Sequence, residues 1–397
     1  MKTVADVNFK GKKVLVRADF NAPLNHNRQV TDETRIRESI PTINKILDDG
    51  GSVILMSHLG RPKGGYEDDY SLTPIVPSLS KHLNRKVIFT RDLFGEKTVQ
   101  TAADLKPGEV ALLENMRFYP EEEAGDEAFA QKIANLADCY VNDAFATAHR
   151  NHMSTAVIAK FFPNEKYAGL LMDSEIKNLN YILKGAKPPF TAIIGGAKIS
   201  SKINIIKNII NKVDNLIIGG GMAFTFIKAL GGKVGDSLCE EDKIEEAKNI
   251  VQEAMLKGVN ILFPTDVIAA DGFSNEAEIK IMEADNILNG WMGLDIGKKT
   301  RRRYAEVINK SETILWNGPM GVFELPNFKQ GTKAMAIAIS SASISGSYTL
   351  IGGGDSVAAI NMYNLADQIS YVSTGGGAML EYLEGKELPG IKALNDN

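Results

Sequence analysis

The sequence predicts an α/β fold with two doubly wound parallel sheets, and three observations support that prediction. Short apolar runs recur along the chain, rich in Val, Ile and Leu without polar alternation, as in strands buried on both faces. Each run is followed by glycine or a polar cluster and then by helix-like patterning, which is typical of parallel strands with right-handed crossovers. The runs are too numerous for one sheet and suit two.

The expected elements follow from these runs in chain order. In the first half we expect strands at 12–16, 52–56, 86–89, 110–113 and 139–141. In the second half we expect strands at 191–194, 215–218, 260–263, 313–316, 348–351 and 369–372. Helical patterns cover 174–185, 243–258 with Gly258 as C-cap, and 356–364.

Length and composition favour two domains. A chain of 397 residues, 44% of them apolar, is long for one core. The natural joint is the helix-like segment from about Ala168 to Gly185, because Pro188 and Pro189 follow it and proline pairs interrupt regular structure.

Several classes of protein are disfavoured. A net charge of −4 argues against nonspecific binding to nucleic acid or to an anionic membrane. No apolar run approaches the length of a membrane-spanning helix, and the first residues lack the apolar stretch of a secretory signal. Cys139 and Cys239 lack metal-ligand spacing and suit thiols in a reducing compartment. We therefore expect a cytoplasmic protein.

Cations gather after the strands of the first half. Ligands of open parallel sheets bind beyond the carboxyl ends of the strands, where Arg17, Arg35, His58, Arg61, Arg117, His149, Arg150 and His152 are expected. Any one of these arginines alone is more often explained by a surface salt bridge. Together they predict a pocket for a small polyanion, since arginine binds carboxylate and phosphate bidentately. Asp19 and Asn21 would hold hydroxyls or orient arginines, and His58 would be a donor on a flexible loop.

Glycines and lysines gather after the strands of the second half. Lys198 and Lys202 are spaced to share one helical face. Three triple-glycine runs, 219–221, 352–354 and 375–377, would let backbone N–H groups approach phosphate oxygens. Asp355 is a candidate magnesium ligand, and equally a candidate N-cap of the helix over 356–364.

The common nucleotide fingerprints are absent from this sequence. No GxxxxGK[ST] occurs, because GLDIGKK has the wrong spacing, and no GxGxxG occurs. A P-loop enzyme and a Rossmann dehydrogenase are therefore disfavoured.

The sequence resembles the phosphoglycerate kinase family over essentially its whole length. VLVRADFNAPL, SHLGRPKG, VNDAFATAHR, GGAKISSK, WNGPMGVFE, GGGDS and STGGGA stand in the family's order. The resemblance implies a monomer that moves a phosphoryl group reversibly from 1,3-bisphosphoglycerate to MgADP, giving 3-phosphoglycerate and MgATP. It also implies two domains facing a cleft, over 1–168 and 169–385, a hinge helix over about 169–185, and a tail, 386–397, packed on the first domain.

The family pattern assigns residues to three roles. The phosphoglycerate would contact Asp19, Phe20, Asn21, Arg35, His58, Leu59, Gly60, Arg61, Arg117 and Arg150. The nucleotide would contact Gly196, Ala197, Lys202, Gly219, Gly220, Gly221, Gly293, Asn317, Pro319, Glu324, Gly352, Gly353, Gly354, Asp355 and Ser356, with Asp355 also at Mg²⁺. Arg35, Lys198, Lys202 and the amides of Gly375, Gly376 and Gly377 would stabilise the phosphoryl group in transfer.

Some positions depart from the commoner family form, namely Ala146, Ser201, Lys298, Ser356, Tyr371 and Met379. They put in question the shape of the nucleotide loops and the behaviour of the hinge, and remove no proposed cation or glycine. Two other readings remain, a hydride-transferring enzyme without its fingerprint and a non-catalytic two-domain protein that binds anions and nucleotides.

Overall fold

The computed structural model describes residues 1–396 and divides into two compact units. The first unit holds Met1–Lys177 and the C-terminal residues from Glu387 onward, and the second holds Asn178–Lys386. The boundary lies inside the helix that we expected at the joint. Within residues 1–396, no helix combines the length and the apolar character needed to cross a bilayer.

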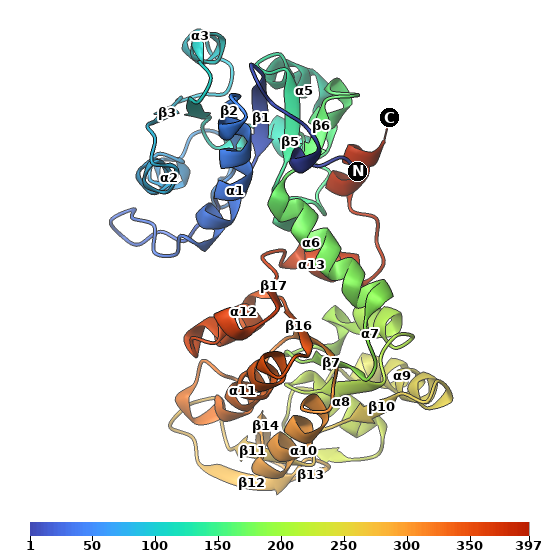
Figure 1. Cartoon of the computed structure of the whole chain (residues 1–397). Helices are drawn as coiled ribbons and strands as arrows, with labels where there is room; N and C mark the ends of the chain where they lie inside the picture. The colour runs from blue at the N-terminus through green and yellow to red at the C-terminus, as the bar shows by residue number, and fades with distance from the viewer. Residues whose placement is uncertain (397) are drawn as a thin grey trace. The chain divides into compact units, whose positions relative to one another are not determined.

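The first unit contains one six-stranded parallel sheet of order β3-β4-β2-β1-β5-β6 (Figure 1). Its strands are β1 (Lys13–Arg17), β2 (Ser52–Met56), β3 (Val87–Phe89), β4 (Val110–Leu112), β5 (Cys139–Asn142) and β6 (Lys166–Ala168). Its helices are α1 (Thr34–Asp48), α2 (Ile75–Leu83), α3 (Glu96–Asp104), α4 (Pro120–Ala124), α5 (Glu127–Ala134), most of α6 (Leu170–Asn180) and α14 (Pro389–Asn395). The five expected strands are present, whereas β6 was missed because KYA is too short to form an apolar run.

The C-terminal helix α14 packs within the first unit. It contacts β6, and the N–H of Gly390 donates to the carbonyl of Ala148 at 2.8 Å. Figure 1 shows it beside the N-terminus.

The second unit contains a six-stranded parallel sheet of order β10-β8-β7-β15-β16-β17. Its strands are β7 (Phe190–Ile194), β8 (Asn215–Ile218), β10 (Asn260–Leu262), β15 (Thr313–Asn317), β16 (Tyr348–Ile351) and β17 (Tyr371–Val372). Its helices are α7 (Ile203–Ile209), α8 (Met222–Ala229), α9 (Ile244–Leu256), α10 (Lys298–Ile308), α11 (Gln330–Ile344), α12 (Gly354–Met362) and α13 (Gly377–Leu383). All six strands expected in this half are present, and two parallel sheets are confirmed.

Two smaller sheets were not predicted. Strands β11 (Asp266–Ala270), β12 (Ile279–Glu283) and β14 (Met292–Ile296) form an antiparallel sheet. The strands β9 (Lys233–Val234) and β13 (Asn286–Ile287) form a short parallel pair. The strand β12 mixes apolar and polar residues, so a search for continuous apolar runs overlooks it. The strands β11 and β14 are mostly buried, and the apolar run 267–270 within β11 was not assigned to a strand.

Helix ends differ from the sequence-based expectations at three places. The helix α6 starts at Leu170, and a π-helical turn, Tyr181–Gly185, follows it. The C-cap of α9 is Lys257, and Gly258 lies just beyond with a φ of +72°. The predicted N-cap role of Asp355 is wrong, because Gly353 caps α12.

A buried carboxylate holds the start of α6. Asp143 directly follows β5, is fully buried, and accepts the backbone N–H groups of Leu171 and Met172 on Oδ1 at 3.0 and 3.2 Å. Burial raises the pKa of Asp143 to about 7, although these amides and the Thr42 hydroxyl favour the charged carboxylate. Protonation of Asp143 is therefore linked to folding.

The free energy of unfolding of the first unit is expected to fall as pH rises from about 4 to about 7. Over this window the folded state keeps the Asp143 proton that the unfolded chain releases at a pKa near 3.8. Asp143→Asn stays neutral and should flatten the pH dependence of the unit's thermal midpoint. Asp126→Asn is the matched control, because Asp126 is exposed and caps α5 through the N–H of Phe129. Equal slopes for D143N and the wild type would contradict a proton held at Asp143.

Candidate functional site

Each sheet has a point where the strand order reverses, and ligands of such sheets bind there. In the first unit β1 lies between β2 and β5, and in the second β7 lies between β8 and β15. The residues that follow these strands are the predicted site residues: Asp19 to Asn21, His58 to Arg61, Gly195 to Lys202 and Asn317 to Pro319. The parallel topology therefore brings each set to one edge of its own sheet.

The predicted phosphoglycerate residues of the first unit are joined by hydrogen bonds. The Asn21 Oδ1 accepts the N–H of Gly60 at 2.8 Å, and the Arg117 Nη1 donates to the carbonyl of Gly60 at 2.8 Å. Arg35 forms an ion pair with Asp19. The segment that begins at His58 is therefore tied down. We expected His58 on a flexible loop, but His58 and the next residue, Leu59, are both buried.

Three arginines of this unit have N–H groups that remain available to bind an anion. The guanidinium groups of Arg61 and Arg150 form no ion pair or hydrogen bond with any residue in 1–396. The Nε of Arg117 is buried without a hydrogen-bond partner, and Glu123 lies 3.5 Å from it. Burial lowers the pKa of Arg117, and the like charges of Arg17 and Arg150 add to the effect. Clustered cations that repel one another favour a bound anion.

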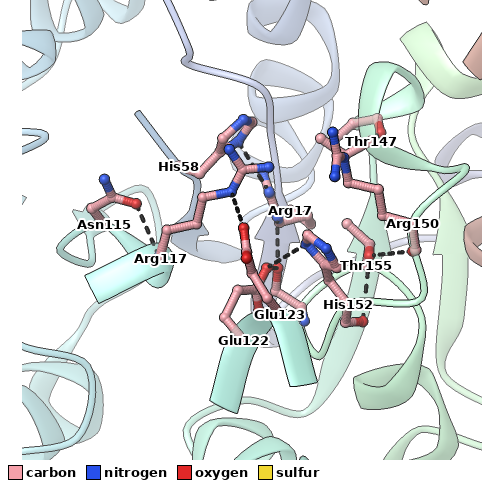
Figure 2. Close-up of polar contacts among 12 residues, drawn as sticks. Arg17, His58, Asn115, Arg117, Glu122, Glu123, Thr147, Arg150, His152 and Thr155 are labelled. Carbon is pink, nitrogen blue, oxygen red and sulfur yellow. Dashed lines mark hydrogen bonds and ion pairs between the residues drawn. The ribbon is translucent and has the colours of Figure 1, made fainter. Parts of the chain in front are cut away.

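Not every predicted cation faces this site. Arg17 was counted among the rim cations, but it is 1% exposed, and its Nη2 lies 3.2 Å from the His58 Nδ1 (Figure 2). Burial and the neighbouring Arg17 hold the pKa of His58 well below its usual range, and burial lowers the pKa of His152 to about 4. Both histidines are therefore neutral at pH 7, and the His58 Nδ1 contacts Arg17 as a neutral group.

Only part of the predicted nucleotide set lines a cavity of about 510 Å³ in the second unit. Its lining includes Gly196, Ala197, Gly220, Gly221, Gly293, Pro319, Glu324 and Asp355 from the sequence-based set. The predicted residues outside its lining are Lys202, Gly219, Asn317, Gly352, Gly353, Gly354 and Ser356. Its apolar wall includes Phe224, Leu238, Val267, Phe273, Met292 and Val322, none of which was predicted. Ligand cavities of this kind are mostly apolar with a few polar groups, which suits a planar base and its ribose. The apolar run over 267–270, which was not assigned to a strand, is the signal that could have revealed part of this wall.

Lys202 does not line that cavity but lies next to a residue that does, because a Cβ on Gly196 would be 4.0 Å from the Lys202 Cε. The Lys202 Nζ donates to the Asn317 Oδ1 at 2.5 Å, and the Asn317 Nδ2 donates to the carbonyl of Gly352 at 2.6 Å. Burial lowers the pKa of Lys202, whereas Asp355 opposes the effect. The Ser356 Oγ is buried and accepts the N–H of Gly318 at 2.6 Å, so it fixes the turn rather than facing the cavity.

The prediction that Lys198 and Lys202 share one helical face is wrong. A 3₁₀ turn, Ile199–Ser201, separates them, and α7 begins only at Ile203. Glycine and serine so close to the strand end favour a tight turn over an immediate α-helix. Lys198 is exposed, while Lys202 is partly buried.

Close packing explains several of the glycines. A Cβ on Gly293 would lie 2.2 Å from the Phe224 ring, and one on Gly220, whose φ is +67°, would lie 2.5 Å from the carbonyl oxygen of Gly196. At Gly376, with a φ of +50°, a Cβ would meet no atom within 4 Å. The Gly375 N–H donates to the Ser373 Oγ at 3.1 Å, so it already has a partner. These glycines shape the turns as well as leave room for a ligand.

Two of the departures from the family form have visible contacts. Met379 is buried, and its Sδ lies 2.0 Å from the position of a Cβ on Gly352, so a larger residue at 352 is excluded. The Ser201 Oγ donates to the carbonyl of Lys198 at 2.9 Å and stabilises the 3₁₀ turn.

Two parallel α/β sheets, one ending in clustered arginines and the other in glycine-rich turns beside an apolar cavity, define a two-domain α/β protein with an anion site and a ligand cavity. A model of the family described as phosphoglycerate kinase matches residues 4–386. A protein of Porphyromonas gingivalis named phosphoglycerate kinase is 49% identical over 99% of this chain and 99% of its own length.

Solved structures agree with this match. The phosphoglycerate kinase of Coxiella burnetii is 40% identical with a TM-score of 0.90, covering 99% of this chain and 98% of its own. The Phosphoglycerate Kinase of Pyrococcus horikoshii is 32% identical with a TM-score of 0.84, covering 100% and 98%. The chain belongs to the phosphoglycerate kinase family.

Proposed function

We propose that the protein transfers the acyl phosphoryl group of 1,3-bisphosphoglycerate to MgADP, giving 3-phosphoglycerate and MgATP, and catalyses the reverse reaction in glycolysis and gluconeogenesis. The observation that carries this proposal is the presence of an arginine cluster in one unit, with an Arg117 Nε that is buried without a hydrogen bond, and of an apolar cavity lined by glycine-rich turns in the other. Family membership over 4–386 supports it. We also propose that the protein is a cytoplasmic monomer, since one chain supplies every proposed group.

The mechanism asks for positioning and charge neutralisation. The acceptor is already an ionised phosphate or carboxylate, so no general base is needed. Arg61, Arg117 and Arg150 are assigned to the phosphate and carboxylate of the phosphoglycerate. Arg35, Lys198, Lys202 and amides at the start of α13 are assigned to the oxygens of the phosphoryl group in transfer.

Magnesium fits the residues present. Mg²⁺ usually takes one or two carboxylates together with substrate phosphates and water. Asp355 is exposed at the cavity and forms no ion pair with any residue in 1–396. Bound Mg²⁺ would neutralise phosphate charge on the nucleotide.

A coupled assay for ATP formation from 1,3-bisphosphoglycerate and MgADP tests the proposed function. Turnover that disappears when Mg²⁺ is chelated supports it. A protein that binds both ligands but forms no ATP would be the non-catalytic binding protein instead. Turnover linked to NAD(H) without ATP would favour the hydride-transfer alternative.

We further propose that substrate and nucleotide together bring the two units toward each other. The proposed groups belong to separate units, and closure would exclude the water that hydrolyses an acyl phosphate. Small-angle X-ray scattering should show a smaller radius of gyration with 3-phosphoglycerate and an unreactive MgATP analogue than with either alone. An unchanged radius with both bound would contradict closure.

A further inference from the structure

A buried carboxylate beneath the arginine cluster takes no part in the proposed mechanism. Glu122 lies on α4 and is fully buried. Its Oε1 accepts the hydroxyl of Ser154 at 2.6 Å, and its Oε2 accepts the backbone N–H of Ser154 at 2.9 Å. A buried carboxylate that accepts two hydrogen bonds from one residue fixes that residue's orientation.

Ser154 in turn fixes the orientation of Arg17 through a hydrogen bond. The Ser154 hydroxyl donates its proton to Glu122, which leaves its oxygen free to accept the Nε–H of Arg17 at 2.8 Å. The Nη1 of Arg17 donates to the carbonyl of Ala18 at 2.5 Å. The guanidinium is thus held at two of its nitrogens, and its third, Nη2, points at the Nδ1 of His58 (Figure 2).

This contact determines where the His58 ring carries its proton. Arginine has no hydrogen-bond acceptor, so the His58 Nδ1, 3.2 Å from Nη2, must accept. Because the ring is neutral, its single N–H is then on Nε2. The Nε2 forms no hydrogen bond with any residue in 1–396, and it is therefore available as a donor.

The charge of Arg17 explains why the chain of hydrogen bonds from His58 ends at a carboxylate, Glu122. Arg17 is a buried cation with no acidic side chain in direct contact, and Glu122 is the buried anion that balances it through Ser154. Arg117 is a neighbouring cation that repels Arg17, and Arg35 disfavours a charge on His58. The His152 Nδ1 lies 3.9 Å from the Glu122 Oε1.

We propose that Glu122 and Ser154 are positioning residues that, through Arg17, hold His58 in the tautomer protonated on Nε2, so that His58 donates a hydrogen bond to the anionic substrate. The donor role of His58 rests on the proposed function. The tautomer itself does not, because it is a property of the ligand-free protein.

The tautomer is tested by ¹⁵N NMR of the full chain labelled at histidine, with His58→Gln to assign the resonances. In the wild type the His58 Nδ1 should resonate as an unprotonated acceptor and Nε2 as a protonated nitrogen. Glu122→Gln and Ser154→Ala should each shift both signals toward values averaged between the tautomers. Glu121→Gln is the matched control, since Glu121 is exposed on the same helix, and should keep the wild-type pattern. A wild-type ring protonated on Nδ1, or variants that retain the wild-type pattern, would overturn the proposal.

Kinetics separate positioning from general structural damage. E122Q should raise the KM for 3-phosphoglycerate about ten-fold while leaving the KM for MgATP unchanged, since one charge-assisted hydrogen bond is weakened. In a His58→Ala background the same substitution should have little further effect. Equal effects of E122Q in both backgrounds would overturn the proposal. Absence of ATP turnover in a wild type with the expected NMR pattern would count against the proposed function alone.

Discussion

Replacing Lys202 with alanine is expected to lower kcat by about 10²- to 10³-fold, the usual cost of losing one preorganised donor at a transferring group. The Lys202 Nζ is already fixed by the Asn317 Oδ1 at 2.5 Å, and Asn317 is fixed by Gly352, so little reorganisation is needed when phosphate charge develops. The loss should fall mainly on kcat, because an interaction made chiefly in the transition state affects turnover more than ground-state binding.

Lys207→Ala is the matched control for this prediction. Lys207 belongs to α7 and forms an exposed ion pair with Glu246, away from the cavity lining, so its loss should leave kcat near the wild-type value. Steady-state rates over a range of MgADP concentrations measure both constants. A K202A enzyme with wild-type kcat and a raised KM for MgADP would show that Lys202 only binds the nucleotide.

The parallel sheets were predictable because strands that are buried on both faces consist of continuous, mostly apolar runs in the sequence. Runs such as 52–56 and 348–351 are mostly apolar, and the structure places strands at these very residues. The strand β12 carries the opposite pattern, because all of its residues except Met282 are exposed, Ile279 and Ile281 among them. Such a strand cannot be separated from a polar loop by its apolar content.

The candidate site was predictable where its chemistry depends on residue type. It was less predictable where the chemistry depends on which way a side chain points. Arginines and triple glycines after strands indicated charge and backbone approach, but the sequence could not tell that Arg17 turns into the interior. Nor did it reveal the apolar wall around Phe224 and Met292, since those residues look like any others of a core. The Lys198 and Lys202 spacing was misread for a related reason, because a 3₁₀ turn and an α-helical turn share similar residues.

Replacing Arg35 with alanine is expected to lower kcat/KM for 3-phosphoglycerate by about 10²- to 10³-fold, because a charge-assisted donor is lost at the site. Arg35 lies in the first turn of α1 and pairs with Asp19, whose side chain is 8% exposed. Removing the guanidinium therefore also leaves a nearly buried carboxylate facing an anionic substrate, which adds repulsion to the lost attraction. Arg37→Ala, on the same helix but exposed, should change kcat/KM little.

A double-mutant cycle divides the Arg35 effect into its two causes. Asp19→Asn in the R35A background removes the unpaired carboxylate, so it should recover the part of the loss due to repulsion while the donor remains missing. Arg35→Lys keeps the charge but not the planar fork, and it should recover kcat/KM only in part, since a lysine cannot bind bidentately. If R35A had wild-type kcat/KM, or if D19N restored it fully, Arg35 would serve only to balance Asp19, and the transferring group would have to be stabilised from the second unit alone.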